Sequence, residues 1–301
     1  MSAPTLVRTD PVDASPLRRA DRTAVRLVAA RSLTTLALLL VWLLAYLLVL
    51  SGFQQGHAQH ALYATLRTEL AEGTAPAGAP IPPGAPVALL EIPGIDLDPT
   101  VVVEGTRSPQ LQTGPGHLTG SVLPGQAGVS VLAGRAVSFG RPFARVPDLR
   151  RGDSVIVTTG QGRFVYRVSG ARLAGDPAPQ PPAAGGSRLT LVTALGGSSR
   201  LGGLQASRTV YVDAELSGDA VAPGPRAGRD PQRELLAPRV DSGSLAQLAL
   251  ALQLLGAVLA GAVWSWRRWS RRGTWVVGVP VVLAALWLAS SIATRFLPAL
   301  V

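Results

Sequence analysis

The sequence predicts an all-β domain attached to three membrane-spanning α-helices, one N-terminal and two C-terminal. Three apolar runs of about 20 residues are long enough to cross a bilayer as helices: Leu33–Leu50, Leu245–Trp264 and Trp275–Thr294. Between the first and second runs, short segments rich in β-branched residues alternate with turn residues. About seven or eight such strands in roughly 130 residues indicate a closed barrel or a sandwich.

The composition excludes several kinds of chemistry. The chain has 301 residues, which is enough for one or two domains with a buried core. It has no cysteine, so disulfides, thiolate metal sites and a cysteine nucleophile are excluded. Its three histidines, His57, His60 and His117, make a zinc site or an imidazole-based catalytic cluster hard to build. We therefore expect neither a metal nor a cofactor.

The first apolar run is expected to be a retained membrane anchor, transmembrane helix 1 over residues 32–53. No charged residue lies from Ser32 to Thr65. The run is longer than the ~7–15 apolar residues of a secretory signal, and SGFQQGHAQH follows it instead of a small-residue cleavage site. A cleaved signal peptide is the less favoured alternative.

The second and third runs are expected to form transmembrane helices 2 and 3, over residues 244–264 and 274–294. Each is apolar on all sides, which disfavours the alternative that they are buried helices of a soluble core. Membrane helices tolerate internal glycine and a proline such as Pro280. Four tryptophans lie where an interfacial aromatic belt is expected: Trp264, Trp266, Trp269 and Trp275.

The placement of arginine predicts the orientation in the membrane. All 28 basic residues are arginine, against 18 acidic residues, and the formal charge is +10. The basic tail 1–31 and the loop 265–273 are expected to be cytoplasmic because both are arginine-rich. Region 52–243 and the tail 295–301 then lie outside. Region 52–243 is close to neutral, with 17 Arg and 15 acids, so we expect a membrane partner and no nucleic acid.

The outer region is expected to hold a β domain between two linkers. Residues 54–86 predict a helical stalk, with Leu62, Leu66 and Leu70 at helical spacing, followed by a Pro/Ala/Gly linker. The β domain covers 87–216, and a second linker covers 217–243. Strands are expected at 87–93, 100–105, 128–134, 153–160, 162–173, 187–195 and 207–216.

A series of motifs in the β domain resembles the sortase family. In order, they are EIPGIDLDPTVVVEG, GPGHLTGSVLPGQAG, VSVLAGRAVSFGRPFARVPDLRRGDSVIVTT, LTLVTA and SRTVYVDAEL, spread over Val87 to Leu216. The series is most similar to membrane-anchored sortases of Gram-positive, high-GC bacteria. The resemblance implies an eight-stranded β-barrel outside the cell. It also implies the family's reaction, in which a cysteine cleaves a C-terminal sorting signal and the acyl group passes to an amine.

That reaction needs a Cys thiolate, a His for proton transfer and an Arg for the oxyanion. By the resemblance, Arg135 of Ala133-Gly134-Arg135 replaces the family histidine. Ala194, which ends Thr190-Leu191-Val192-Thr193-Ala194, replaces the family cysteine, and Arg208 retains the arginine position. Thr193, Arg135 and Arg208 are expected to line the substrate groove. The resemblance therefore implies an inactive pseudo-sortase that works in cell-envelope sorting or as a binding scaffold.

Two other functions stay open. One is a cysteine-independent transpeptidase or hydrolase that uses a hydroxyl of Thr193, Ser198 or Ser199, although a hydroxyl needs a base and a guanidinium cannot serve as one. His117 is the only histidine in the β domain and is expected to be a surface or capping residue. The other alternative is a purely structural envelope protein.

The altered pocket is expected to favour anions. If Arg135 and Arg208 converge on Ala194, a carboxylate or phosphate between them would relieve the repulsion of the two guanidinium groups. Partners would then be a sorting-signal peptide, a cell-wall precursor or an active sortase. In the alternative, Arg135 points to solvent or pairs with Asp148 or Glu215.

Overall fold

The computed structural model describes residues 15–195, 208–225, 242–268, 271–296 and 300. The chain divides into two compact units, Met1–Ala45 and Tyr46–Val301. In the first unit, helix α1 spans Ser15–Ala45, and its leucines from Leu33 to Leu40 are exposed. An apolar helix surface that no protein covers is suited to contact with lipid.

The second unit begins with a π-helical turn, η1 (Tyr46–Leu50), and the helix α2 (Ser51–Glu72). Helix α2 ends where Gly73 adopts a left-handed conformation with φ of 69°. The Gln59 side chain joins α2 to the β domain. Its amide nitrogen donates to the Val101 carbonyl at 3.0 Å and to the Thr113 carbonyl at 2.8 Å. Its amide oxygen accepts a hydrogen bond from the Val101 N–H at 2.7 Å. The helix is therefore tied to the β domain by directed hydrogen bonds.

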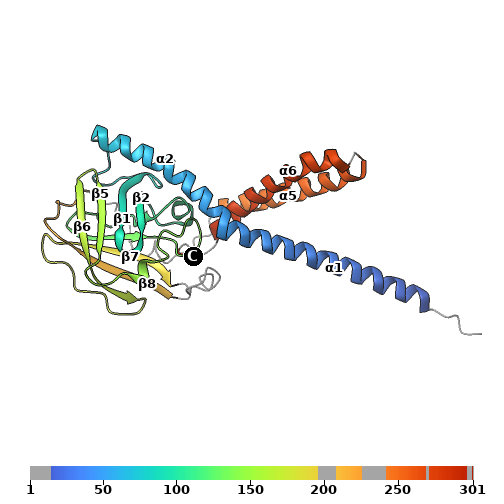
Figure 1. Cartoon of the computed structure of the whole chain (residues 1–301), viewed down its shortest axis with the longest axis horizontal. Helices are drawn as coiled ribbons and strands as arrows, with labels where there is room; N and C mark the ends of the chain where they lie inside the picture. Colours follow the sequence, from blue (N-terminus) through green and yellow to red (C-terminus); the bar gives the residue numbers. More distant parts are fainter. Residues whose placement is uncertain (1–14, 196–207, 226–241, 269–270, 297–299, 301) are drawn as a thin grey trace, which may run out of the picture. The chain divides into compact units, whose positions relative to one another are not determined.

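The β domain is a closed barrel of eight strands in the order β1-β2-β3-β4-β7-β8-β6-β5 (Figure 1). The β2–β3 and β4–β7 pairs are parallel, and the other neighbours are antiparallel. This closure confirms the predicted barrel and excludes the sandwich. The strands are β1 (Pro86–Ile92), β2 (Leu97–Glu104), β3 (Gly116–His117), β4 (Gly128–Ala133), β5 (Ser154–Thr159), β6 (Gly162–Leu173), β7 (Ser187–Leu195) and β8 (Arg208–Leu216).

Buried and exposed side chains alternate along the strands, and the buried side chains fill the barrel interior. On β6, Phe164, Tyr166 and Val168 are buried, whereas Arg163 and Arg167 are exposed. Such alternation follows from the two-residue period of a strand, in which successive side chains point to opposite faces. The apolar core of the barrel collects such residues from the strands and from the loop after β4, including Val87, Leu90, Leu132, Phe143, Val157, Leu189 and Val212.

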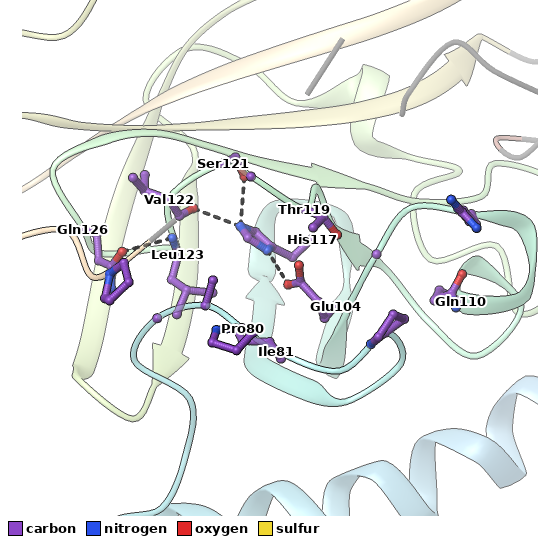
Figure 2. A pocket seen from close by; sticks show the side chains of 17 residues that line it. Pro80, Ile81, Glu104, Gln110, His117, Thr119, Ser121, Val122, Leu123 and Gln126 are labelled. Atoms are coloured by element: carbon purple, nitrogen blue, oxygen red, sulfur yellow. Dashed lines mark hydrogen bonds and ion pairs between the residues drawn. The ribbon is translucent and has the colours of Figure 1, made fainter. Parts of the chain in front are cut away.

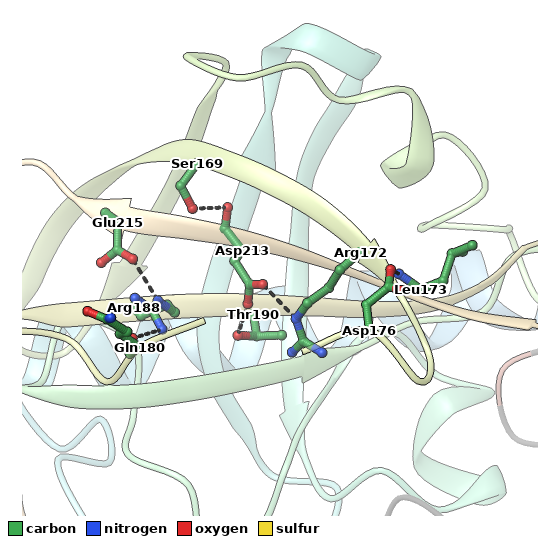
Figure 3. Close-up of polar contacts among 9 residues, drawn as sticks. All are labelled: Ser169, Arg172, Leu173, Asp176, Gln180, Arg188, Thr190, Asp213 and Glu215. Atoms are coloured by element: carbon green, nitrogen blue, oxygen red, sulfur yellow. Dashed lines mark hydrogen bonds and ion pairs between the residues drawn. The ribbon is translucent and has the colours of Figure 1, made fainter. Parts of the chain in front are cut away.

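Several polar side chains on β6, β7 and β8 are paired with one another (Figure 3). Arg172 Nε donates to Asp213 Oδ2 at 2.9 Å, and Thr190 Oγ1 donates to Asp213 Oδ1 at 2.6 Å. Arg188 Nε donates to Glu215 Oε1 at 2.6 Å. Arg172 and Arg188 are thus neutralised by acids on the neighbouring strand β8. Both arginines have a structural role.

The C-terminal part of the second unit is a pair of apolar helices, α5 (Ser242–Arg268) and α6 (Arg271–Ala293), followed by the 3-10 turn η5 (Thr294–Phe296). The two helices pack side by side through small residues (Figure 1), with Ala251, Ala285 and Ala289 in their contact. Together with the segment that starts at Leu33, they are long and apolar enough to cross a membrane. The predicted arrangement of one N-terminal and two C-terminal helices that are apolar enough to span a membrane is confirmed. Ser198, Ser199, Trp269 and residues 226–241 lie outside the described residues.

Candidate functional site

The strand register brings the predicted site residues to one end of the barrel. Strands β4 and β7 run parallel with Ala133 opposite Val192, and the next N–H along the chain, at Gly134, donates to the Val192 carbonyl at 3.0 Å. Arg135 and Ala194 each lie two residues beyond this pair. Arg208 begins β8 opposite Leu195. The main chain therefore places Arg135, Ala194 and Arg208 close in the fold, although they lie far apart in sequence.

Arg135 is fully buried, with 0% of its surface exposed. Its Nη1 donates to Ser138 Oγ at 3.2 Å, and its Nη2 donates to Ser108 Oγ at 2.8 Å. The guanidinium carbon also lies 5.0 Å from the centre of the Phe139 ring, within cation–π range. Burial lowers the pKa of Arg135 to about 10, below the usual value of an arginine. The group still carries its charge at neutral pH, in an environment where the charged form is disfavoured.

The alternative in which Arg135 points to solvent is wrong. The side chain does not point to solvent, because it turns inward toward the helix α3 (Ser108–Leu111). Of the two acids considered as partners, Asp148 lies 3.8 Å from Arg145, and Glu215 binds Arg188. Arg208, in contrast, is exposed at the start of β8. The site therefore combines one buried and one exposed guanidinium.

Ala194 lies under an apolar cover. It is 6% exposed and packs with Ala136 and Val137, against which Leu48 of η1 and Leu300 also pack. The Ala136 N–H donates to the Leu300 carbonyl at 3.0 Å. The methyl group of Ala194 offers no nucleophilic atom, and its surroundings are closed by side chains from two other segments of the same unit.

Thr193 is buried with 0% exposure, and its hydroxyl donates to the Gly134 carbonyl at 3.1 Å. The Phe143 carbonyl lies 3.4 Å from the same oxygen. A hydroxyl proton directed at carbonyl oxygens is not held by a base, so Thr193 is not arranged as a nucleophile. The close approach also requires glycine at 134, because a Cβ there would lie 2.4 Å from the Phe143 ring.

A second concave region lies beside the ends of β2 and β3 (Figure 2). It is a cavity of about 640 Å³ between the linker before β1, the end of β2 and the loop after β3. His117 lies in its wall with only 2% of its surface exposed, and its Nδ1 is 2.7 Å from Glu104 Oε2. Of the predicted surface or capping roles, the surface role is therefore wrong, and the contacts of Nε2 with Ser121 and the Val122 carbonyl fit the capping role. The parallel β2–β3 pairing, with Glu104 opposite His117, buries the ring, and a two-residue strand leaves no pattern in the sequence.

Comparisons with known proteins agree with this barrel. Residues 90–214 match the family model of the sortase domain. Sortase D of Bacillus subtilis (strain 168) is 33% identical over 85 residues, which make up 28% of this chain and 41% of that protein. The match thus spans about two-fifths of the length of that relative.

Solved sortases align over most of their own length. A sortase D5 transpeptidase of Clostridium perfringens is 20% identical, with a TM-score of 0.43, and the alignment covers 54% of this chain and 99% of that one. Sortase E of Streptomyces avermitilis is 26% identical, with a TM-score of 0.38, and the alignment covers 48% and 93% of the two chains. On the family match over residues 90–214, the chain carries a domain that matches the sortase family model.

Proposed function

We propose that this chain is a membrane-anchored pseudo-sortase that binds an anionic ligand at the outer face of the membrane and does not transfer peptides. The ligand would be the carboxylate of a sorting-signal peptide or the phosphate of a cell-wall precursor, presented to the cell's sorting machinery. Three properties of the site support this proposal: the missing nucleophile, the missing base and the buried cation.

The absence of a nucleophile and base supports an inactive site. The chain has no cysteine, and by the motif resemblance Ala194 takes the place of the family nucleophile. By the same resemblance Arg135 takes the place of the family histidine, and its pKa of about 10 keeps it protonated at neutral pH. A protonated guanidinium has no lone pair to accept a proton, so it cannot act as the base.

The buried charge of Arg135 is the observation that carries the binding proposal. The lowering of the Arg135 pKa to about 10 means that the fold disfavours the charged form by roughly 3 kcal/mol. An anion beside the guanidinium would recover part of this free energy through charge-assisted hydrogen bonds. Arg208, exposed at the same end of the barrel, would attract the anion from solvent.

The placement of the domain outside the cell is supported by the arginines that flank the spanning helices. The loop around Arg267 and Arg268 is basic without acids, and the N-terminal tail is also basic. By the positive-inside rule both lie in the cytoplasm. The barrel, which lies in sequence between the first and second candidate spans, would then lie outside, where wall precursors and sorting signals are exposed.

The test is titration of the full-length chain in detergent with two probes, a peptide that ends in a free carboxylate and inorganic phosphate. Arg135→Gln is expected to weaken binding by roughly tenfold to a hundredfold, because it removes a charge worth up to ~3 kcal/mol. Arg208→Ala is expected to weaken it less, since an exposed charge contributes about 1 kcal/mol or less. Arg163→Ala, an exposed arginine on β6, serves as the matched control and should leave the affinity unchanged.

Each outcome assigns a different function. Peptide binding without phosphate binding would identify a peptide ligand, and the reverse would identify a phosphorylated precursor. Binding of neither probe would contradict the proposal and favour the purely structural envelope protein. Binding that survives Arg135→Gln unchanged would remove Arg135 from the site.

A further inference from the structure

The cavity lined by Glu104, His117 and Ser121 contains a hydroxyl, an imidazole and a carboxylate in series. Ser121 Oγ lies 2.9 Å from His117 Nε2, and His117 Nδ1 lies 2.7 Å from Glu104 Oε2 (Figure 2). Glu104 is 4% exposed and His117 is 2% exposed, whereas Ser121 is only partly buried. All three residues line the cavity of about 640 Å³. None of them belongs to the site around Arg135 and Ala194.

The two distances have the geometry that activates a serine. A carboxylate only accepts hydrogen bonds, so Glu104 places the ring proton on Nδ1 of the neutral imidazole. Nε2 is then left with a lone pair that faces the Ser121 hydroxyl, which is the relation of base and nucleophile in serine hydrolases. The Val122 carbonyl lies 3.0 Å from the same Nε2. A carbonyl only accepts, so this contact is a hydrogen bond when Nε2 carries the proton, and the Val122 carbonyl then competes with Ser121 for Nε2; the serine is activated in the tautomer with the proton on Nδ1.

The walls of the cavity combine apolar surface with one exposed cation, Arg107. Pro80, Ile81 and Leu123 provide apolar surface, and Gln110 provides an amide. The backbone N–H of Val122, the residue after the serine, has no hydrogen-bond partner within the described part of the chain. Such an N–H is suited to stabilise an oxyanion. A cavity of this size holds a small ligand and leaves no room for a folded partner.

We propose that Ser121, His117 and Glu104 form a second, hydrolytic site that takes small carboxylic esters. In the first step Ser121 Oγ attacks the ester carbonyl, its proton passes to His117 Nε2, and the same proton then goes to the leaving alkoxide, which departs as an alcohol. In the second step water attacks the acyl-serine, its proton passes through His117, and the carboxylic acid is released. The net reaction is ester plus water to acid plus alcohol. It is independent of the function proposed for the Arg135 site.

The first experiment is labelling of the full-length chain in detergent with a fluorophosphonate probe, followed by peptide mapping. We expect the adduct on Ser121 and its loss in Ser121→Ala and His117→Gln. Ser154→Ala, on strand β5, is the control and should keep the adduct. Hydrolysis of p-nitrophenyl acetate is expected to fall at least a hundredfold in Ser121→Ala, as for other serine nucleophiles.

A second variant keeps the test meaningful if Ser121→Ala or His117→Gln fails to fold. Because the chain has no native cysteine, Ser121→Cys introduces a unique thiol that retains the volume and polarity of the site. An imidazole that withdraws the thiol proton should make iodoacetamide alkylation at pH 7 at least tenfold faster than for Ser154→Cys. Glu104→Gln in the Ser121→Cys background tests Glu104 as a positioning residue and should slow this alkylation.

Two results would overturn the proposal. One is the absence of any fluorophosphonate adduct on Ser121 in the unmodified chain. The other is alkylation of Ser121→Cys no faster than that of Ser154→Cys. In either case the Glu104–His117–Ser121 series would be a buried structural contact that holds β2, β3 and the following loop together.

Discussion

Replacing Tyr166 by phenylalanine should destabilise the barrel while leaving its shape unchanged. Tyr166 is fully buried in the barrel core, and its hydroxyl accepts the Gly125 N–H at 2.6 Å and lies 3.0 Å from Ser187 Oγ. Phenylalanine fills the same space but leaves the buried Gly125 N–H without an acceptor. An unsatisfied buried donor costs ~1–3 kcal/mol, so we expect a loss of about 2 kcal/mol in the free energy of unfolding.

The same substitution should change how stability depends on pH. Burial raises the pKa of Tyr166 above its usual value of 10.0, so the folded state favours the neutral phenol. A group with this shift contributes stability below pH 10 that is lost as the pH rises through the folded-state pKa. The unmodified chain should therefore lose stability above pH 10 more steeply than Tyr166→Phe. The difference between the two proteins should shrink there.

The assay is pulse proteolysis in urea on the full-length chain in detergent, because the barrel contains no tryptophan and its unfolding is not visible in tryptophan fluorescence. Tyr63→Phe is the matched control, since Tyr63 is 47% exposed on α2 and should change stability by less than about 0.5 kcal/mol. A loss below 0.5 kcal/mol for Tyr166→Phe would refute the reasoning. A difference between Tyr166→Phe and the unmodified chain that stays constant above pH 10 would also refute it.

Three further predictions concern the membrane topology and the Arg135 site. Ser270→Cys should resist an impermeant thiol reagent in intact cells, whereas Ser154→Cys should react, and labelling at 270 would place that loop outside. Ala194→Cys alone should transfer sorting-signal peptides poorly. Ala194→Cys combined with Arg135→His should transfer them faster, because the thiol then has an imidazole nearby. Equal transfer rates for the two variants, measured by mass spectrometry of the products, would show that position 135 does not reach the thiol. Leu300→Ala should raise the affinity for phosphate or peptide a few-fold in the titration, because it loosens the cover over Ala194; a lower affinity would make Leu300 part of the binding surface.

The barrel was largely predictable from the sequence, because its strands carry strong local patterns. The runs at 162–173 and 187–195 coincide with β6 and β7, and the run at 128–134 contains β4. The apolar runs likewise identify the spanning helices, since length and hydrophobicity alone decide whether a helix can cross a bilayer. Strand β3 was not predicted, because two residues carry no period and its pairing is with distant strands.

The side-chain directions at the site were less predictable than its location. Motif order placed Arg135 and Ala194 together, but nothing in the local sequence indicates that the Arg135 side chain turns toward Ser108 and becomes buried. His117 illustrates the same limit. Its partner Glu104 lies 13 residues earlier and meets it only through the parallel β2–β3 pairing. Long-range pairings decide both cases, and they depend on the closed barrel rather than on neighbours in the chain.

The most direct test of the central claim is to incubate the full-length chain in detergent with a sorting-signal peptide and an amine acceptor, and to analyse peptide and protein by mass spectrometry. The Ser121→Ala variant is run in parallel, so that hydrolysis in the second cavity is not mistaken for sortase chemistry. We predict that the peptide remains intact and that no acyl group appears on the barrel, while the same peptide binds in titration. Cleavage of the peptide with transfer to the amine, unchanged in Ser121→Ala, would contradict the pseudo-sortase function.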